Sequence, residues 1–256
     1  MRYLITFVLL VATLQLHAQK EIKGSANKSY EVKNFTQVFE NIEVEGPLNV
    51  VLTQSEKRNV GVEVDDNLQK YVLMVVEGNT LKIKLDNQVI IKGMKFNKIE
   101  VSNPRFVNIT KKGTGSLTSA NNLTGTTGQL NIEGSGTVNL NMAVSTLNVI
   151  CSGSGALNLN YIGNTIGIAA SGSINIEAHG ECKTLNIAQS GSGNLNAEHL
   201  ISKTINLNKD GSGNAILNCQ ISMNAVLNGS GSVKYKGPCI VNKEEYGSGK
   251  VEQIIE

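Results

Sequence analysis

The sequence has 256 residues, with 23 basic and 21 acidic side chains and a formal net charge of +2. That length allows one or two domains with a core of their own. No stretch gathers Lys or Arg on one face, so the charge pattern gives no support for a nucleic-acid partner. Aromatic residues make up 4% and tryptophan is absent, which favours a core filled by Val, Ile and Leu.

The first 18 residues have the pattern of an export signal. Met1-Arg2-Tyr3 precedes the apolar run 4–16, and the small residue Ala18 follows. This order predicts a secretory signal peptide cleaved after Ala18. A membrane anchor is the alternative, but the run is too short to span a bilayer comfortably. No second long apolar stretch follows, so we expect an exported, secreted protein with no transmembrane segment in the mature chain.

The part between residues 19 and 110 is rich in strand signals. Residues 19–34 are polar and predict an N-terminal arm or a first edge strand. Residues 35–110 predict a strand-rich part continuous with the repeats beyond residue 110. Asp65 or Asp66 is a candidate N-cap for one or two helical turns. Residues 73–85 alternate around Glu77-Gly78-Asn79 and predict a hairpin.

A phrase in this part occurs twice. Phe39-x-x-Ile-Glu-Val-x-x-Pro47 returns as Phe96-x-x-Ile-Glu-Val-x-x-Pro104, with an offset of 57 residues. The repetition predicts a duplicated unit whose second copy runs into the first coil of the region beyond residue 110. No Pro-rich or Ser-rich hinge separates the two parts, so the N-terminal part is expected to cap the same stack and cover an open β edge.

Residues 111–256 contain a repeated Gly-Ser-Gly tripeptide, or a close variant, which we call the corner motif. From first residue to first residue the spacings are 21, 19, 17, 21, 20, 18 and 18. A period near 20 that tolerates small slippage is typical of a solenoid, in which each repeat forms one coil. The motifs begin at Gly113, Gly134, Gly153, Ala170, Gly191, Gly211, Gly229 and Gly247.

Short strands flank each corner motif. Segments such as Leu130-Asn131-Ile132 before a motif and Leu157-Asn158-Leu159-Asn160 after one alternate apolar and polar residues. Period 2 indicates strands with one buried face, and glycine suits the corner because it reaches positive φ without a Cβ penalty. We assign this structural role to Gly134, Gly136, Gly153, Gly155, Gly172, Gly191, Gly193, Gly211, Gly213, Gly229 and Gly231.

The period and the alternation together predict an all-β fold. A coil of about 20 residues has little room for a helix besides two strands, and Gly, Asn and β-branched residues are poor helix formers. A flexible Gly/Ser linker is the alternative, but the repeated aliphatic alternation argues against it. We therefore expect a parallel β-helix, that is, a β-solenoid, and we choose the right-handed form because parallel crossovers nearly always have that hand.

Cysteine and histidine give no metal pattern. The four cysteines are spaced by 31, 37 and 20 residues, which fits no CxxC site. Cys219 and Cys239 lie one coil apart, so export makes them a candidate disulfide, with buried free thiols as the alternative. His179 and His199 take different places relative to their corner motifs and are interpreted as solvent-facing loop residues. We expect no cofactor and no metal.

Catalytic residues are equally hard to assemble. A polysaccharide hydrolase or lyase needs carboxylates aligned on one face, yet the candidate carboxylates take differing positions in their coils and form no column. Calcium-binding β-rolls carry Asp in register at their corners, whereas only Asp210 sits at a corner here. The carboxylates weighed are Glu133, Glu177, Glu181, Glu198 and Asp210.

Asparagine is the polar residue that recurs. Asn139, Asn158, Asn175 and Asn196 each stand five residues after the start of a corner motif, and a second set occupies the preceding strands. Stacked outward amides can hydrogen-bond along the rod and stabilise it, and an amide face can also bind glycans. We favour the solvated ladder that stabilises the stack and keep glycan binding as the alternative.

Several segments together resemble a known family. They are the signal peptide, the phrase from Ile42 to Leu52, the Asp66-Asn67-Leu68 helix, the strand from Gly78 to Ile83 and the corner motifs. They are similar to the "putative auto-transporter adhesin, head GIN domain" family (DUF2807), common in exported proteins of Bacteroidetes-type bacteria, over residues 35–250. The resemblance implies a β-solenoid and an exported location. No transmembrane strands follow residue 247 that would serve self-translocation.

From these observations we expect an exported, non-enzymatic, adhesin-like binding module. Its place would be the periplasm, the outer-membrane surface or the medium, and its partner a cell-surface glycan or another protein of the cell envelope. The alternatives are a carbohydrate-active enzyme on a β-helix and a purely structural envelope protein.

Overall fold

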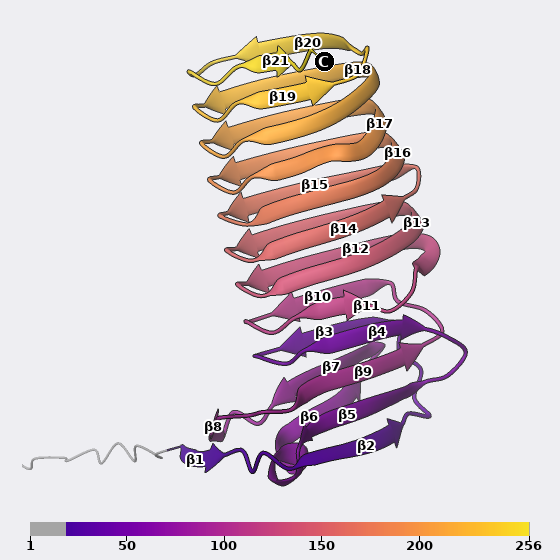
Figure 1. Cartoon of the computed structure of the whole chain (residues 1–256). Helices are drawn as coiled ribbons and strands as arrows, with labels where there is room; N and C mark the ends of the chain where they lie inside the picture. The colour runs from indigo at the N-terminus through magenta and orange to yellow at the C-terminus, as the bar shows by residue number, and fades with distance from the viewer. Residues whose placement is uncertain (1–18, 256) are drawn as a thin grey trace, which may run out of the picture.

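The protein is a β-solenoid of about eight turns (Figure 1). The structure, a computed structural model, describes residues 19–255, so the expected signal peptide at residues 1–18 lies outside the described residues. The predicted all-β solenoid is confirmed. Within the described range, no helix is long and apolar enough to cross a membrane.

The solenoid is built from strands that pair only in parallel with the coils above and below. Segments that precede a corner form one sheet, which we call the pre-corner sheet, and segments that follow a corner form the post-corner sheet. The strands are β10 (Asn108–Lys112), β11 (Leu117–Ser119), β12 (Leu123–Gly134), β13 (Thr137–Gly153), β14 (Ala156–Ile162), β15 (Thr165–Gly172), β16 (Asn175–Gly191), β17 (Leu195–Gly211), β18 (Ala215–Gly229), β19 (Val233–Lys236), β20 (Ile240–Glu245) and β21 (Val251–Gln253).

Glycine is required at the corners for two different reasons. The first glycine of a motif has positive φ, as at Gly153 (123°) and Gly191 (108°), a conformation that L side chains avoid. The last glycine lies against the previous coil. A Cβ placed on Gly155 would stand 2.3 Å from the carbonyl oxygen of Gly136. Most corners beyond residue 110 therefore lack a side chain at both positions, and the exception is the corner at Gly172, where the buried Ile174 takes the last position.

The sequence motif places one corner two residues too early. Ala170, the first residue of that motif, is a buried residue of β15, paired with Cys151 and Gln189. The turn begins at Gly172, which has φ of 88° and pairs with Gly153 and Gly191. The backbone N–H of Ser173 donates to the Gly153 carbonyl oxygen at 2.8 Å.

The interior consists of aliphatic columns that run along the rod. Leu130, Val149 and Ile168 succeed one another in register on the pre-corner sheet, and all are buried. Burying one such side chain stabilises the fold by about 1.5–3 kcal/mol. The inward column nearest the corner is less uniform, because Lys111, Gln189 and Lys209 point into the interior there.

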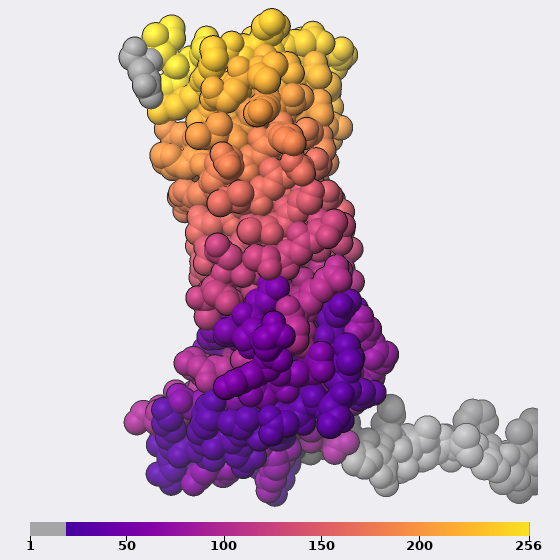
Figure 2. All heavy atoms as spheres, turned by 90° about the vertical axis from the view of Figure 1, so that its right-hand side faces the viewer, coloured from indigo at the N-terminus to yellow at the C-terminus, as the bar shows by residue number. Residues whose placement is uncertain are grey.

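The N-terminal part forms the base of the same stack. Strand β10 pairs with β3 on one side and β12 on the other, so the expected boundary near residue 110 falls inside a strand. Figure 2 accordingly shows one continuous column from base to tip. The elements are β1 (Lys20–Lys23), β2 (Lys28–Asn34), β3 (Asn41–Glu45), β4 (Val50–Gln54), β5 (Asn59–Asp65), the 3-10 helix η1 (Asp66–Tyr71), β6 (Val72–Glu77), β7 (Thr80–Leu85), β8 (Val89–Lys92) and β9 (Asn97–Asn103).

The duplicated phrase does not correspond to a repeated structural unit. Its first copy lies in β3, which stacks under β10 in the pre-corner sheet. The second lies in β9, which pairs in parallel with β4 and antiparallel with β5. Strand β2 pairs antiparallel with the other side of β5. The end of the stack is therefore covered by antiparallel strands, which shield the open edge of the parallel coils.

Asp65 organises this base in a different way from the one expected. It precedes η1, but its side chain makes no N-cap bond to that helix. The buried carboxylate instead accepts hydrogen bonds from the backbone N–H groups of Ala26, Lys95 and Phe96. Burial alone would raise the pKa of Asp65, but these donors bring it below its ordinary value.

Candidate functional site

The outer face of the pre-corner sheet carries a column of side-chain amides. Because strands alternate and coils pair in register, the same outward position recurs in every coil. We call this set the amide column. Along the rod it contains Asn41, Asn108, Gln129, Asn148, Gly167, Asn186, Asn206, Asn224 and Asn242.

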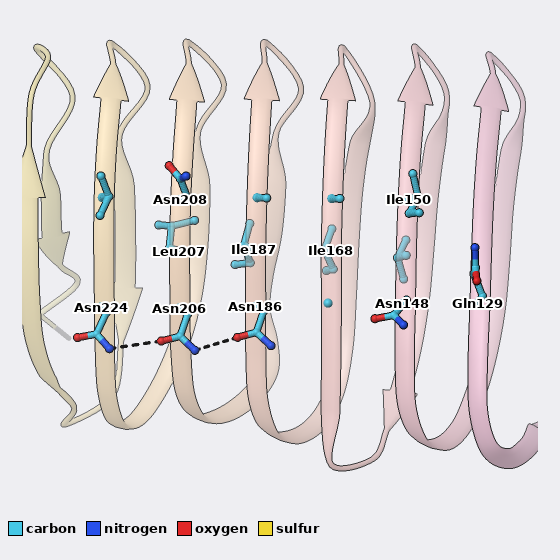
Figure 3. Close-up of a pocket in the computed structure, with 15 residues that line it drawn as sticks. Gln129, Asn148, Ile150, Ile168, Asn186, Ile187, Asn206, Leu207, Asn208 and Asn224 are labelled. Carbon is cyan, nitrogen blue, oxygen red and sulfur yellow. Dashed lines mark hydrogen bonds between the residues drawn. The ribbon is translucent and has the colours of Figure 1, made fainter.

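Neighbouring amides of the column hydrogen-bond in one direction. Asn224 Nδ2 donates to Asn206 Oδ1 at 3.3 Å, and Asn206 Nδ2 donates to Asn186 Oδ1 at 2.8 Å (Figure 3). Asn108 Nδ2 donates to Asn41 Oδ1 at 2.9 Å. Asn206 therefore accepts from one neighbour and donates to the other, as in the stacked amide ladders of cross-β assemblies.

The amide column is interrupted at Gly167. Gly167 pairs with Asn148 on one side and Asn186 on the other, and it places no side chain between them. Asn186 accepts a bond from Asn206, and its Nδ2 is turned toward the Gly167 side (Figure 3). Asn148 Oδ1 lies 3.3 Å from the point where a Cβ of Gly167 would stand. A donor and an acceptor thus face the gap from opposite sides.

A shallow groove of about 630 Å³ surrounds this gap. Its floor is the next outward column, where Ile150, Ala169, Ala188, Asn208 and Val226 follow the amides. Ile150 is 48% exposed. The hollow lies over the two alanines beside it, because their side chains are short. The residues that line the groove include no ionisable side chain. The face therefore offers hydrogen-bonding amides next to an uncharged alkyl surface.

A smaller hollow of about 260 Å³ extends the groove toward the glycine corner. It shares Ile150, Ala169 and Ala188 with the groove and adds Ser171, Ser190 and Asp210 at its outer side. Two small hydroxyls and the Asp210 carboxylate thus border the alkyl floor on the side opposite the amides. This arrangement suits a ligand that has several hydrogen-bonding groups and no negative charge.

The sequence matches a family model over residues 38–238, described as "Putative auto-transporter adhesin, head GIN domain". The chain belongs to this family. That match covers the base and nearly all of the solenoid, so the groove lies inside the family domain. None of the curated proteins compared with the chain matches it.

Solved structures from Parabacteroides and Bacteroides species share the fold. A protein of Parabacteroides distasonis described as a "putative lipid binding protein" is 24% identical, with a TM-score of 0.83, over 92% of this chain and 100% of its own. A "putative adhesin" of the same species is also 24% identical, with a TM-score of 0.80 and the same coverage. A "putative adhesin" of Bacteroides fragilis is 22% identical, with a TM-score of 0.69, over 91% and 100%. At these identities the likeness concerns the fold.

The asparagine set predicted from the sequence does not form one column in the structure. Asn158 Nδ2 donates to Asn139 Oδ1 at 2.6 Å on the post-corner sheet. Asn175, however, pairs with Ala156, and Glu177 takes the position next to Asn158. Asn196 follows Glu177. The cause is the corner at Gly172: counting from Ala170 displaces Asn175 by two residues, into the neighbouring outward column.

The asparagines nearest the corner make a ladder of another kind. Asn175 Oδ1 accepts from the backbone N–H of Asn194 at 3.1 Å, and Asn194 Oδ1 accepts from the N–H of Asn214 at 2.9 Å. These side chains satisfy backbone donors at the turns, so they stabilise the corners. Their Oδ1 atoms are engaged within the fold, unlike Asn186 Nδ2 and Asn148 Oδ1, which face the gap at Gly167.

The two histidines lie together, which the spacing did not predict. A register shift in the pairing of β16 with β17 brings His199 opposite His179. Their rings stack with centroids 5.4 Å apart, and His179 Nε2 lies 3.3 Å from Glu177 Oε1. In residues 19–255 no group of three or more metal-ligating side chains is present, and two imidazoles alone make a weak site.

The carboxylates considered for catalysis do not form an acid pair. Glu133 and Asp210 share an outward column of the pre-corner sheet, but the strands β13, β15 and β16 lie between their own. On the other sheet, Glu198 pairs with Lys236 at 2.7 Å, which lowers the pKa of Glu198. A general acid needs the opposite shift.

Cys219 and Cys239 are buried free thiols in the structure, the alternative that the spacing also allowed. Burial, together with a hydrogen bond to Cys239, raises the pKa of the Cys219 thiol to about 12. That bond places the two thiols in contact. A disulfide between them in an oxidising compartment stays a prediction.

Proposed function

We propose that this chain is an exported, adhesin-like binding module that holds its ligand on the outer face of the pre-corner sheet and catalyses no reaction. The groove at the interrupted amide column supports the proposal. An uncharged alkyl floor beside unpaired amides is suited to binding, since specificity comes from a few placed polar groups over an apolar surface. The family description points the same way.

An enzyme on this scaffold is the weaker alternative. Glycoside hydrolysis needs two carboxyl groups flanking one bond, one of them with a raised pKa. The groove has no carboxylate among its lining residues, and Asp210 at its extension has no second carboxylate in the same hollow. We therefore propose recognition without turnover.

Lipid binding is a second candidate, because one structural neighbour carries that description and because Ile150, Ala169 and Ala188 form an alkyl floor. The shape of the groove argues against it. An acyl chain on this open face would keep much of its own surface in water, whereas ligand sites generally enclose most of the ligand. Hydrogen-bonding ligands suit an open groove better.

The test combines location and binding. Intact cells are treated with protease and blotted for the rod, with a periplasmic control protein and a lysed sample. Purified protein is then assayed for binding to cells, to glycan arrays and to lipid vesicles. Ala188→Arg, which fills the groove, should abolish binding, and Ala156→Arg on the post-corner sheet should retain it.

Some outcomes would contradict the proposal. Full protection in intact cells, with digestion after lysis, would place the rod in the periplasm and replace adhesion by a role within the envelope. Equal binding by Ala188→Arg and Ala156→Arg would show that the ligand does not bind in the groove. Turnover of a polysaccharide by the purified protein would restore the enzyme interpretation.

A further inference from the structure

The gap at Gly167 has the dimensions of one missing amide. Adjacent strands lie about 4.8 Å apart, and an amide measures about 2.2 Å from oxygen to nitrogen. From Asn186 to Asn148 there are two strand spacings, so about 7.4 Å separates the facing donor and acceptor along the rod. Two hydrogen bonds of about 2.9 Å leave about 1.6 Å between them along the rod, which one amide group of about 2.2 Å spans when it is tilted to the axis. A single hydroxyl oxygen is too small to bridge that distance.

The polarity of the gap fits an amide as well. Asn186 Nδ2 faces the gap as a donor, and Asn148 Oδ1 faces it as an acceptor (Figure 3). Within residues 19–255 neither atom has a hydrogen-bond partner in the structure. A ligand group must accept on one side and donate on the other, at a fixed separation. A secondary amide does both.

The surroundings indicate what carries the amide. Beside the gap lie Ala169, Ala188 and Ile150, whose alkyl surface suits a methyl group and the C–H face of a sugar ring. A peptide laid over this open floor would pair only the backbone groups that reach the gap and would leave the others to water, so the groove has no row of partners for an extended backbone. An acetamido sugar has one amide for each ring, and the absence of ionisable lining residues favours a neutral one.

We propose that the Gly167 gap recognises the acetamido group of an N-acetylated hexosamine in a neutral glycan. The amide of the sugar takes the place of the missing ladder member, accepting from Asn186 and donating to Asn148. Its methyl group packs on Ala169 and Ala188. This inference rests on the proposed function, because it names the ligand class of the same groove.

Gly167→Asn is the decisive variant. It supplies the missing amide from the protein itself and so blocks the ligand. The backbone tolerates the change, since a Cβ at Gly167 meets only the end of the Asn148 side chain. Gly125→Asn is the matched control, because a Cβ there has no neighbour closer than 3.8 Å. Thermal melting of both variants confirms that they fold.

Binding is measured by calorimetry with three ligands: N-acetylglucosamine trisaccharide, the glucose trisaccharide of the same linkage, and a short alanine peptide that has an N-terminal acetyl group and a C-terminal N-methylamide. The acetylated sugar should bind wild type at least about tenfold more tightly than the glucose trisaccharide. Gly167→Asn should weaken its binding by about tenfold or more, and Gly125→Asn should not. Competition by peptidoglycan fragments or by host-type N-acetyllactosamine glycans then distinguishes the two sources of this chemistry.

Equal affinity for the two sugars, preference for the peptide, or wild-type affinity in Gly167→Asn would overturn the inference. If Ala188→Arg still abolished surface binding in that case, the proposed function would stand without it. If wild type bound neither surfaces nor sugars, the proposed function itself would fail.

Discussion

Replacing Lys209 with methionine should stabilise the protein. Lys209 belongs to the inward column of β17 and is 1% exposed, and its Nζ has no hydrogen-bond partner. A buried donor without a partner costs about 1–3 kcal/mol. Methionine keeps a side chain of similar length in the core and removes the ammonium. We therefore expect Lys209→Met to raise the free energy of unfolding by about 1–3 kcal/mol in urea titrations.

Lys111→Met is the matched control in the same inward column. Lys111 is also buried, but its Nζ donates to the Gly113 carbonyl oxygen. Losing that bond offsets the benefit, so this variant should be less stable than Lys209→Met by about 1–3 kcal/mol. Equal effects of the two substitutions would refute the reasoning, as would destabilisation of Lys209→Met by more than about 1 kcal/mol.

The pH dependence provides an independent check. Burial lowers the pKa of Lys209 from its ordinary value of 10.5. The unfolded chain therefore binds a proton that the folded chain binds less well, and stability must rise with pH between the lowered pKa and 10.5. Lys209→Met should lack this part of the rise. A wild-type profile that coincided with that of the variant would contradict the assignment.

Three further predictions concern single contacts. Gly191→Ala should cost about 3 kcal/mol of unfolding free energy, because φ is 108° and the new Cβ would stand 2.3 Å from the Gly172 carbonyl oxygen. Gly125→Ala should be near neutral, because the nearest atoms to its new Cβ lie 3.8 Å away. Tyr161→Phe should cost about 1 kcal/mol, because the buried hydroxyl that contacts the Thr165 carbonyl oxygen at 2.7 Å is lost. The pKa of Glu245 is lowered to about 2, chiefly by a hydrogen bond from the Val251 backbone N–H and then by hydrogen bonds from the Lys243 and Lys250 side chains. This stabilisation is complete above pH 4.5 and disappears as the pH falls toward 2, so hydrogen exchange at Val251 should accelerate there in wild type and not in Glu245→Gln.

The fold could be predicted because each coil repeats the same local chemistry. Aliphatic residues at period 2 give half-buried strands, and glycine at a fixed spacing gives the corner. The sequence could not predict the register in which neighbouring coils pair at the places where the corner motif varies. Ala170-Ser171-Gly172 resembles a corner motif, yet only Gly172 needs positive φ. An error of two residues moves a side chain to the next outward position, and this puts Asn175 in the wrong column.

The sequence shows a second set of asparagines in the strands before the corners, but the interruption of their column at Gly167 was missed for the same reason. Counted from the glycine with positive φ, the amide column lies five residues before each corner, and Gly167 then occupies an asparagine position before Gly172. The histidine stack and the placement of β9 are different cases. They depend on a register shift and on pairing with β5, and both are long-range contacts. Local propensity has no information on such pairings.

The interruption at Gly167 also separates the two roles that an amide column can have. If the column served stability alone, asparagine at position 167 would add two ladder hydrogen bonds and remove a flexible glycine from a strand, each of which stabilises. The chain has the less stable choice at the centre of its uncharged groove. Residues that serve binding commonly forgo stability. Gly167→Asn should therefore raise the melting temperature and, in the same variant, weaken binding by about tenfold or more. A more stable variant that binds as wild type does would leave the column with a structural role only.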